Sequence, residues 1–377
     1  MHATAWRGRV SSTSELHVSP RSGRSGGVAV VVSGWPRLSE TFALNELLAL
    51  RKAGMLAAVF ATKACDLALI QPHSDELDVQ ILAHGDAERQ GAEVAQRLFD
   101  TDVMAVHGYF AHHPAAVAQV AARHLRVPFG FSVHAVDARK VTARVLASRA
   151  RSASTVVACN PDVAVALNDV GCPPTLLPHG VDLDRFCVAD PPDGPVLQLL
   201  AVGRLVEKKG FEVLGQAMAQ LTGVHLKVVG DGPLRAALQA QAEALALGDR
   251  VQFVGRKTHD ELPAQYAAAD MVIVPSVVDR TGDRDGLPNV VLEGMACARP
   301  IVGSDVAAIS TAVVDGITGV LVPPGDVAAL SEAIRLLTRN RSLRHALGAA
   351  GRRRAESQFD LDQCGLRFCN ELERAYA

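Results

Sequence analysis

Two acidic residues, Asp285 and Glu293, lie eight positions apart in the stretch DGLPNVVLEGMACARPIVGSD (285 to 305). Pro288 fits the first turn of a helix that we expect to run to about Ala298. The unpaired amides around 287 to 291 would attract an anion to the positive end of the helix dipole. Glu293 would lie about one and a half turns into the helix, where a carboxylate can accept both hydroxyls of a ribose. Asp285 precedes the helix. It would contact the hydroxyls of the group attached to the phosphate that lies farther from the ribose.

Two basic residues, Arg204 and Lys209, occupy the stretch GRLVEKKG (203 to 210), which follows a predicted strand. Gly203 lets the backbone leave the strand tightly, so that a guanidinium fork and an ammonium group can converge on one anion, such as a diphosphate. Taken alone, Arg204 and Lys209 could be solvated charges at the start of a helix. Asp285 and Glu293 could likewise be ordinary acidic residues at a helix start and on a helix surface. The combination of both stretches in one crevice favours a binding site for a nucleoside diphosphate.

Short β-branched runs alternate with Ala- and Leu-rich stretches from Val28 onward, the pattern of parallel sheets covered by helices on both faces. In the first half we expect strands at 28–32, 57–60, 103–106, 128–133, 154–158 and 175–178, and helices at 40–52, 113–125 and 160–169. In the second half we expect strands at 197–202, 225–229, 250–254, 271–274 and 300–302, followed by a helical tail at 327–376.

The pattern predicts an α/β protein with two doubly wound, Rossmann-like domains that face a central cleft. We expect a mobile leader at 1–27, an amino-terminal domain at 28–186, a Pro-rich linker at 187–196 and a carboxy-terminal domain at 197–377, whose last helix, 361–376, can return to the first domain. Ligands of open α/β sheets bind at the carboxyl ends of the strands. The stretches SGWPRLSE, VHAVD, GRLVEKKG and DGLPN all follow strands and would meet there.

Composition argues against several classes of protein. The 377 residues include 38 Lys and Arg against 40 Asp and Glu, so the net charge of -2 provides no basic field for nucleic acid or anionic lipid. Seven scattered cysteines without a CxxC pair suit the reduced thiols of a cytoplasmic protein. We see no signal peptide and no apolar run long enough to span a bilayer, which also favours the cytoplasm. The spacing of His107, His112, His113 and His134 fits no common zinc motif.

These stretches resemble the retaining, GT-B-type glycosyltransferases of family 4. GRLVEKKGF, LPAQYAAADMVIVPS and DGLPNVVLEGMACARPIVGSD are similar to the carboxyl half of that family, whose signature is two acids separated by seven residues. SGWPRLSETFALNELLAL, VHGYFAHHPAAVA, FSVHAVDA and LLPHGVDLDRF resemble its exopolysaccharide branch. The resemblance covers nearly everything after residue 27. The first acid of the signature is usually Glu, whereas this chain has Asp285.

The resemblance implies a role for each matching residue. Arg204 and Lys209 would bind the diphosphate of a nucleotide sugar and Glu293 its ribose. Asp285 would lie at the donor sugar with the backbone of the helix start, namely Gly286, Leu287, Pro288, Asn289 and Val290. Gly34 would let the backbone approach the phosphates, His134 would contact the donor sugar, and the backbone at Gly255 and Arg256 would hold the base. Because cations already neutralise the phosphates, we expect no metal and no other cofactor.

The acceptor is expected to bind to the amino-terminal domain, at Trp35, Glu40, Tyr109, His112 and Asp137. The interval 42–107 lacks the basic, aromatic face of a membrane-surface helix, which favours a small soluble acceptor and no stable membrane association. An aminocyclitol or aminoglycoside intermediate of antibiotic biosynthesis is our hypothesis. Acids such as Glu40, Glu46 and Asp137 could meet a cationic amino sugar, although surface solvation explains each of them more simply.

Other functions remain open at this point. We expect a UDP-linked donor, and a polysaccharide-assembly transferase would use the same donor on a lipid-linked acceptor. A nucleotide-sugar epimerase, a phosphorylase or a sugar-nucleotide sensor could share the cleft. A dinucleotide-dependent oxidoreductase should show GxGxxG after the first strand, where this chain has SGWPRL.

Overall fold

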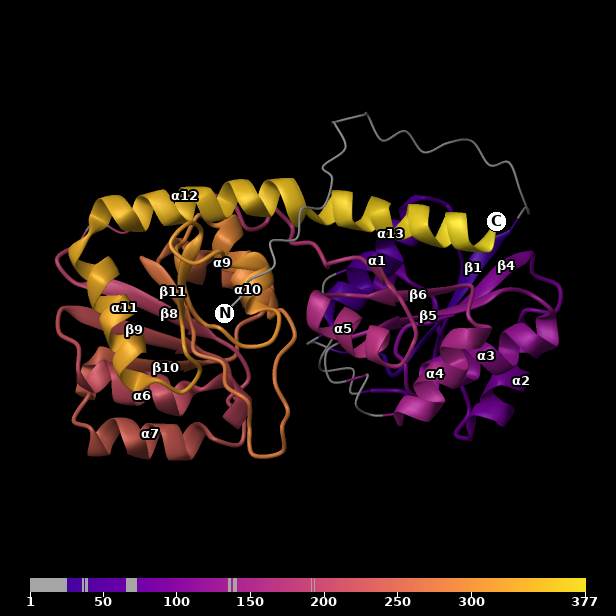
Figure 1. Ribbon diagram of the computed structural model, residues 1–377, viewed down its shortest axis with the longest axis horizontal. Helices are drawn as coiled ribbons and strands as arrows, with labels where there is room; N and C mark the ends of the chain where they lie inside the picture. The colour runs from indigo at the N-terminus through magenta and orange to yellow at the C-terminus, as the bar shows by residue number, and fades with distance from the viewer. Residues whose placement is uncertain are drawn as a thin grey trace.

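The computed structural model describes residues 26–35, 37, 40–65, 73–134, 137, 141–190, 192 and 194–377. The expected leader therefore lies outside the described residues, except Gly26 and Gly27. Two α/β domains lie side by side, and two long helices, α12 (Arg341–Gln358) and α13 (Leu361–Tyr376), run along one flank of both (Figure 1). Among the helices that the structure describes, none is long and apolar enough to cross a membrane.

The amino-terminal domain is built on a seven-stranded parallel sheet in the order β3-β2-β1-β4-β5-β6-β7. Its strands are β1 (Gly27–Val32), β2 (Leu56–Ala61), β3 (Val79–Ile81), β4 (Val103–Gly108), β5 (Phe129–Val133), β6 (Thr155–Ala158) and β7 (Thr175–Leu176). Its helices are α1 (Thr41–Lys52), α2 (Ala87–Arg97), α3 (His113–Leu125), α4 (Ala143–Ser152) and α5 (Pro161–Asp169), with a short 3₁₀ turn at Ser74–Glu76.

The carboxy-terminal domain repeats this plan with six strands in the order β10-β9-β8-β11-β12-β13. The strands are β8 (Leu197–Val202), β9 (Val224–Val229), β10 (Val251–Gly255), β11 (Met271–Val274), β12 (Ile301–Ser304) and β13 (Gly319–Val322). The helices are α6 (Phe211–Ala219), α7 (Arg235–Ala244), α8 (Leu262–Ala267), α9 (Asn289–Ala296), α10 (Ile309–Ala312) and α11 (Val327–Arg339), with 3₁₀ turns at Glu207–Lys209 and Gly248–Arg250. The predicted fold class, two doubly wound domains, is confirmed.

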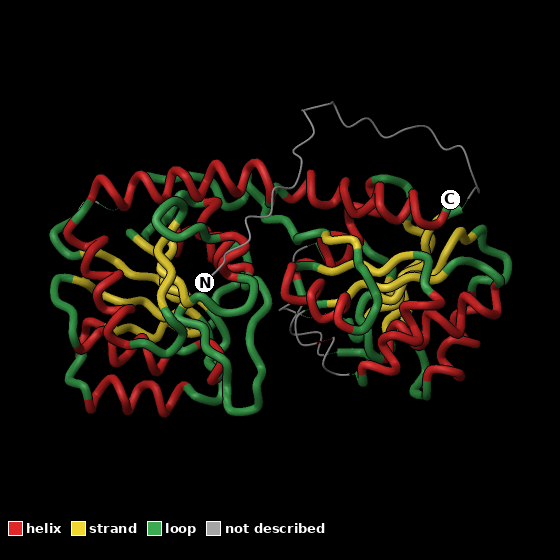
Figure 2. The backbone as a smooth tube through the Cα atoms, viewed as in Figure 1, coloured by secondary structure: helices red, strands yellow, loops and turns green. Residues whose placement is uncertain are grey.

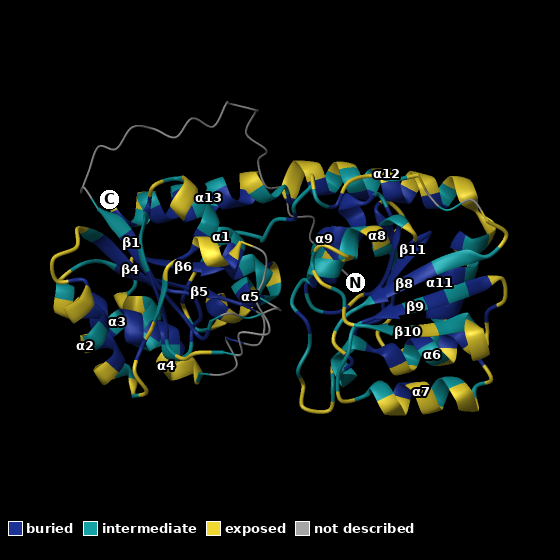
Figure 3. Cartoon of the chain, turned by 180° about the vertical axis from the view of Figure 1, so that it is seen from behind, coloured by how far each residue is buried: buried dark blue, intermediate teal, exposed yellow. Residues whose placement is uncertain are grey.

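The alternation of side chains along β1 explains why helices must cover both faces of the sheet. Val28, Val30 and Val32 pack in one cluster with α1 and α13, whereas Ala29 and Val31 pack in the other with α2 and α3. All five side chains are at most 1% exposed. Figure 2 shows the strands enclosed by helices in each domain, and Figure 3 shows that the strands are buried while the outer faces of the helices are exposed.

The last helix, α13, belongs structurally to the amino-terminal domain. Its Tyr376 is 2% exposed and its hydroxyl lies 2.7 Å from Nδ1 of His107 on β4. Glu371 accepts hydrogen bonds from the hydroxyls of Thr155 and Thr175, at 2.7 and 3.1 Å. The consecutive helices α12 and α13 therefore connect the second domain back to the first.

Gly210 brings the loop after β8 against the end of β11. Its φ is +65°, and a Cβ there would lie 1.8 Å from the carbonyl oxygen of Pro275. We expect Gly210→Ala to destabilise the protein by about 3 kcal/mol, since backbone must move and the left-handed conformation is also disfavoured. Gly223→Ala is the matched control: its φ is +70° with no atom within 4 Å of a Cβ, so only about 1 kcal/mol is expected. Urea unfolding compares them, and equal losses would contradict the packing explanation.

Candidate active site

Lys209, which is predicted to bind phosphate, and Asp285, which is predicted to lie at the donor sugar, belong to a cluster of two lysines and two aspartates. Nζ of Lys209 lies 2.8 Å from Oδ2 of Asp285, which also accepts a hydrogen bond from Ser276 at 3.0 Å. Nζ of Lys208 lies 3.0 Å from Asp283 and 3.7 Å from the other oxygen of Asp285. Asp285 is 9% exposed. Its ion pairs hold both lysines, which follow β8, against the loop that follows β11. Each ammonium keeps N–H donors for a further anion.

Arg204 lies beside this cluster. The aliphatic stem of Lys209 passes 3.5 Å from the position of a Cβ on Gly203, directly before Arg204 in the chain. Arg204 is exposed, and it makes no ion pair with the part of the chain that the structure describes. That Arg204 and Lys209 converge on one anion stays a prediction.

Glu293 is the buried acid of the site. It lies on α9, is 6% exposed, and its Oε2 accepts a hydrogen bond of 2.6 Å from the hydroxyl of Tyr266. Burial raises the pKa of Glu293 to about 7, against the opposing effects of the Tyr266 hydroxyl and of the positive charge on Lys209. A carboxylate with a perturbed pKa in a cleft is a candidate for ligand contact.

The start of α9 lies where the two domains meet. Pro288 precedes the helix as its cap residue, rather than occupying its first turn as predicted, and the helix ends at Ala296 rather than near Ala298. The Val291 amide donates to the Pro288 carbonyl at 3.0 Å, so that amide is not available to an anion. The Asn289 side chain donates to the hydroxyl of Thr41 on α1, at 2.9 Å. Gly286, Leu287 and Val290 are half-buried around it.

A second contact links the domains. The guanidinium of Arg284 lies 2.9 Å from a carboxylate oxygen of Asp162 on α5. Together with the bond between Asn289 and Thr41, it joins the loop that contains Asp285 to the amino-terminal domain. The candidate donor site is thus framed by both domains.

His134 follows β5 in the amino-terminal domain. It is 6% exposed, its Nδ1 lies 3.2 Å from Nε2 of His179, and its Nε2 has no hydrogen-bond partner among the described residues. Burial, and then the neighbouring His179, hold the pKa of His134 well below its usual value, so the imidazole is neutral. A buried ring nitrogen without a partner suits contact with a ligand.

The remaining predicted donor residues lie at strand ends. Gly34 follows β1, where a Cβ would come 2.8 Å from the sulfur of Cys65. Gly255 ends β10 with φ +77°, and its carbonyl accepts from the Gly230 amide at 2.8 Å. Arg256 is exposed directly after it.

Several predicted acceptor contacts are corrected by burial. Tyr109 is 0% exposed and donates its hydroxyl to Glu46, so it cannot contact a soluble acceptor. Asp137 is 3% exposed and accepts from the Ala111 amide at 2.5 Å, with His112 at 3.6 Å. Glu46 is bonded to His179 as well as to Tyr109, which also removes it as a receptor for an amino sugar.

Two further acceptor candidates, Trp35 and Glu40, lie between β1 and α1. Trp35 is half-buried in a bridge with Ala64 after β2. Glu40 precedes α1 and forms an ion pair with Arg37. The acceptor side of the site therefore rests on fewer residues than the sequence suggested.

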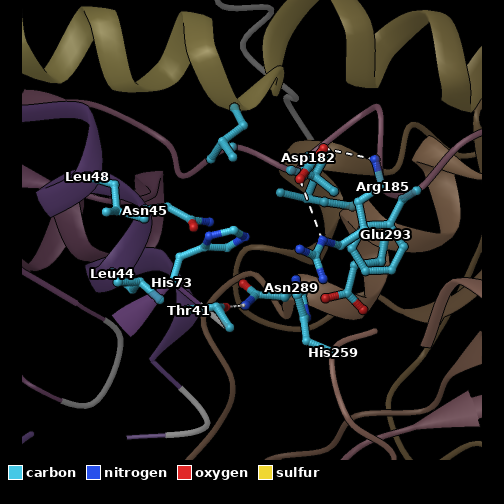
Figure 4. A pocket seen from close by; sticks show the side chains of 15 residues that line it. Thr41, Leu44, Asn45, Leu48, His73, Asp182, Arg185, His259, Asn289 and Glu293 are labelled. Atoms are coloured by element: carbon cyan, nitrogen blue, oxygen red, sulfur yellow. Dashed lines mark hydrogen bonds and ion pairs between the residues drawn. The ribbon is translucent and has the colours of Figure 1, made fainter. Parts of the chain in front are cut away.

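A cavity of about 170 Å³ lies between the domains beside Glu293 (Figure 4). Asn45 and His73 line it from the amino-terminal domain, and Asn289, Glu293 and His259 from the carboxy-terminal domain. Polar groups from both domains thus reach the region next to the buried acid. The Lys209 and Asp285 cluster lies outside this cavity.

The sequence did not reveal several partners of the predicted residues, among them Lys208, Tyr266, Glu46 and His179. Of these, Lys208 adjoins Lys209 in a quoted motif, and its charge was the available signal. The others lie 27 to 133 positions from their partners, and no spacing rule connects such pairs. The sequence also did not reveal that His134, Cys159 and His179 place ligand-type atoms within 4.8 Å of one another.

Two models of known protein families match the chain, one for each of its two domains. Residues 190–354 match the family model described as glycosyl transferases group 1, and residues 40–185 match that of glycosyltransferase family 4. The chain carries two glycosyltransferase domains. They correspond to its two sheets, and the Lys209, Asp285 and Glu293 side chains all belong to the group 1 domain.

Two relatives and one solved structure illustrate the similarity. The lipopolysaccharide core biosynthesis glycosyltransferase LpsE of Rhizobium meliloti is 34% identical over 179 residues, 48% of this chain and 50% of that protein. The alpha-D-kanosaminyltransferase of Streptomyces kanamyceticus is 30% identical over 177 residues, 46% of this chain and 44% of that protein. The match therefore spans about half the length of each relative. Crystalline HepE of Anabaena, in complex with UDP, has a TM-score of 0.80 at 19% identity, covering 92% of this chain and 100% of that one.

Proposed function

We propose that this chain is a retaining glycosyltransferase, which moves a hexose or amino-hexose from a nucleotide sugar to a hydroxyl of a small soluble acceptor. The observation that carries the proposal is the ion pair of Lys209 with Asp285, at 2.8 Å, close enough to the buried Glu293 for the Lys209 charge to act on that carboxyl. Cations for a diphosphate, a buried acid for a ribose and a neutral imidazole for a sugar are the groups that this transfer needs.

In the proposed reaction, the bond between the anomeric carbon and the diphosphate oxygen breaks, and its electron pair leaves with the diphosphate. The acceptor oxygen forms its bond to the anomeric carbon on the same face, and the acceptor proton passes to the departing phosphate oxygen. Lys209, Arg204 and the first amides of α9 stabilise the charge on that phosphate. A carboxylate found glycosylated in a trapped intermediate would contradict front-face attack.

We propose a UDP-linked donor and no metal ion. The positive groups at Lys208, Lys209 and Arg204 provide the charge that a divalent ion would otherwise supply. HepE, which shares the fold, was crystallised with UDP. Activity that persists in excess EDTA is the expected result.

The acceptor is proposed to be soluble because charges on the outer helices of the amino-terminal domain pair with one another. Arg97 pairs with Glu93, and Arg123 pairs with Glu88 at 2.8 Å, so these helices do not present a uniformly basic face to anionic lipid. An aminocyclitol or an aminoglycoside intermediate is the acceptor class we favour, in keeping with the kanosaminyltransferase. The alternative, a lipid-linked glycan, is in keeping with LpsE. Flotation with anionic liposomes separates them, since stable binding would support the alternative.

Thermal stability with added nucleotide sugars tests the donor site. At a donor concentration of 100 Kd we expect about 2.7 kcal/mol of stabilisation, with UDP-glucose or UDP-N-acetylglucosamine ahead of GDP-mannose. Arg204→Ala should abolish the shift, whereas Arg123→Ala, on the far surface of α3, should leave it unchanged. If the donor raises the melting temperature of Arg204→Ala and Arg123→Ala equally, Arg204 does not bind the donor.

A further inference from the structure

Three side chains from separate elements form a hydrogen-bonded chain beneath the cleft. Glu46 of α1 accepts from Nδ1 of His179, which follows β7, at 2.8 Å. Nε2 of His179 lies 3.2 Å from Nδ1 of His134, which follows β5. The chain ends at Nε2 of His134, a buried atom without a partner among the described residues. Glu46, His179 and His134 are named here the imidazole relay.

The geometry between the two imidazoles is that of a shared proton rather than of a shared metal. The ring centroids are 5.1 Å apart and the planes differ by 20°, while the facing nitrogens are 3.2 Å apart. The two rings are therefore nearly parallel and contact each other through a hydrogen bond between their facing nitrogens. Two ligands of a tetrahedral zinc would instead aim at a third point. The nearby Cys159 therefore does not by itself make this a metal site.

The carboxylate at one end of the relay decides where the protons lie. Ionised Glu46 can only accept, so Nδ1 of His179 carries a proton. Burial is the largest single effect and lowers the pKa of His179, but the charge of Glu46 together with hydrogen bonds to Cys159 and Glu46 raises that pKa overall, to about 10. His179 is then an imidazolium whose Nε2–H donates to Nδ1 of His134. Neutral His134 must carry its own proton on Nε2.

We propose that Glu46 and His179 are positioning residues that fix His134 with its proton on Nε2, ready to donate to an oxygen of the donor sugar. The aromatic rings of Tyr109 and Phe42 lie 4.9 and 5.0 Å from the His134 ring and hold its plane. The second oxygen of Glu46 accepts from the hydroxyl of Tyr109, which fixes the carboxylate in turn. The catalytic consequence rests on the proposed function, whereas the proton arrangement does not.

Nitrogen-15 NMR of histidine-labelled protein tests the proton arrangement without any substrate. We expect His179 doubly protonated and His134 protonated on Nε2 at pH 7.5. In Glu46→Gln, the amide oxygen still accepts from Nδ1 of His179, but His179 becomes neutral and its bare Nε2 faces Nδ1 of His134. The proton of His134 should therefore move to Nδ1. An unchanged His134 tautomer in Glu46→Gln, a neutral His179 in the wild type, or one zinc per purified chain would each overturn the inference.

Kinetics tests the consequence for transfer. Glu46→Gln and His179→Asn should each lower kcat about 10- to 100-fold, because a donor aimed at the transition state is lost, while the thermal shift caused by UDP alone is retained. The control, His113→Asn, removes a half-buried imidazole of the same domain whose one hydrogen-bond partner among the described residues is neutral Gln90, at 2.8 Å, and kcat should stay the same. Tautomers as expected with unchanged kcat in both variants would overturn the positioning role. A wild-type chain without transferase activity but with the expected tautomers would instead count against the proposed function alone.

Discussion

Lys209→Ala is expected to lower kcat/KM about 10³-fold while the protein stays folded, because one positioned cation at a departing phosphate contributes on that scale. The ammonium lies 2.8 Å from Asp285 and 18% of its side chain is exposed, so it is held in place yet reachable. After its removal, Asp285 keeps the Ser276 hydroxyl and the more distant Lys208 as partners. Steady-state kinetics and a melting curve measure the two effects separately.

Lys208→Ala is the comparison variant. Lys208 contributes the same charge one residue earlier, but its nearer partner is Asp283, at 3.0 Å. We expect a loss at least tenfold smaller than for Lys209→Ala. Equal losses would show that total positive charge matters, rather than the placement of Lys209.

Glu293→Gln is expected to weaken donor binding about 100-fold and to stabilise the empty protein at pH 8. An ionised carboxylate can accept both ribose hydroxyls, whereas an amide offers one accepting oxygen. The Gln side chain can still accept from the Tyr266 hydroxyl, so the packing of α9 should be kept. Calorimetric titration with UDP and urea unfolding at pH 8 measure the two results.

The pH profile of stability follows from the raised pKa of Glu293. Below pH 4.5 the acid is protonated in both the folded and the unfolded chain, and it costs nothing. As pH rises from 4.5 to about 7, the unfolded chain ionises first, so stability is lost progressively, by about 3 kcal/mol in total. Above pH 7 the loss is constant. The Glu293→Gln variant should not show this loss of stability with rising pH.

Donor affinity should change in the opposite direction. Wild-type affinity for UDP is expected to rise between pH 6 and pH 8, as Glu293 ionises, and the Gln variant should be flat over this range. Tyr266→Phe removes a hydroxyl that favours the charged form, so its affinity rise should move to higher pH. A wild-type profile without any rise would contradict a ribose contact at Glu293.

Much of the fold could be predicted from local patterns. Nearly every β-branched run became a strand within one or two residues, and Asn160 caps α5 as expected, accepting from the Val163 amide at 3.0 Å. Among the elements that were not predicted are β13 (Gly319–Val322), β3 and α2. β3 has three residues with no buried side chain, and α2 is mostly polar with small buried residues such as Gly91 and Ala95.

The sequence by itself determined the alternation of strands and helices, and with it the edge at which polar loops must gather. It also indicated Lys209, Asp285 and Glu293, because each lies in a motif in the segment that follows a predicted strand. Only the tertiary structure decided which of these groups pair, since Tyr266 reaches Glu293 and Glu46 reaches His179 across 27 and 133 positions. It also decided burial, which turned Tyr109 and Asp137 from acceptor candidates into internal supports. Periodicity specifies which face a side chain takes, whereas contact and desolvation depend on how distant segments pack.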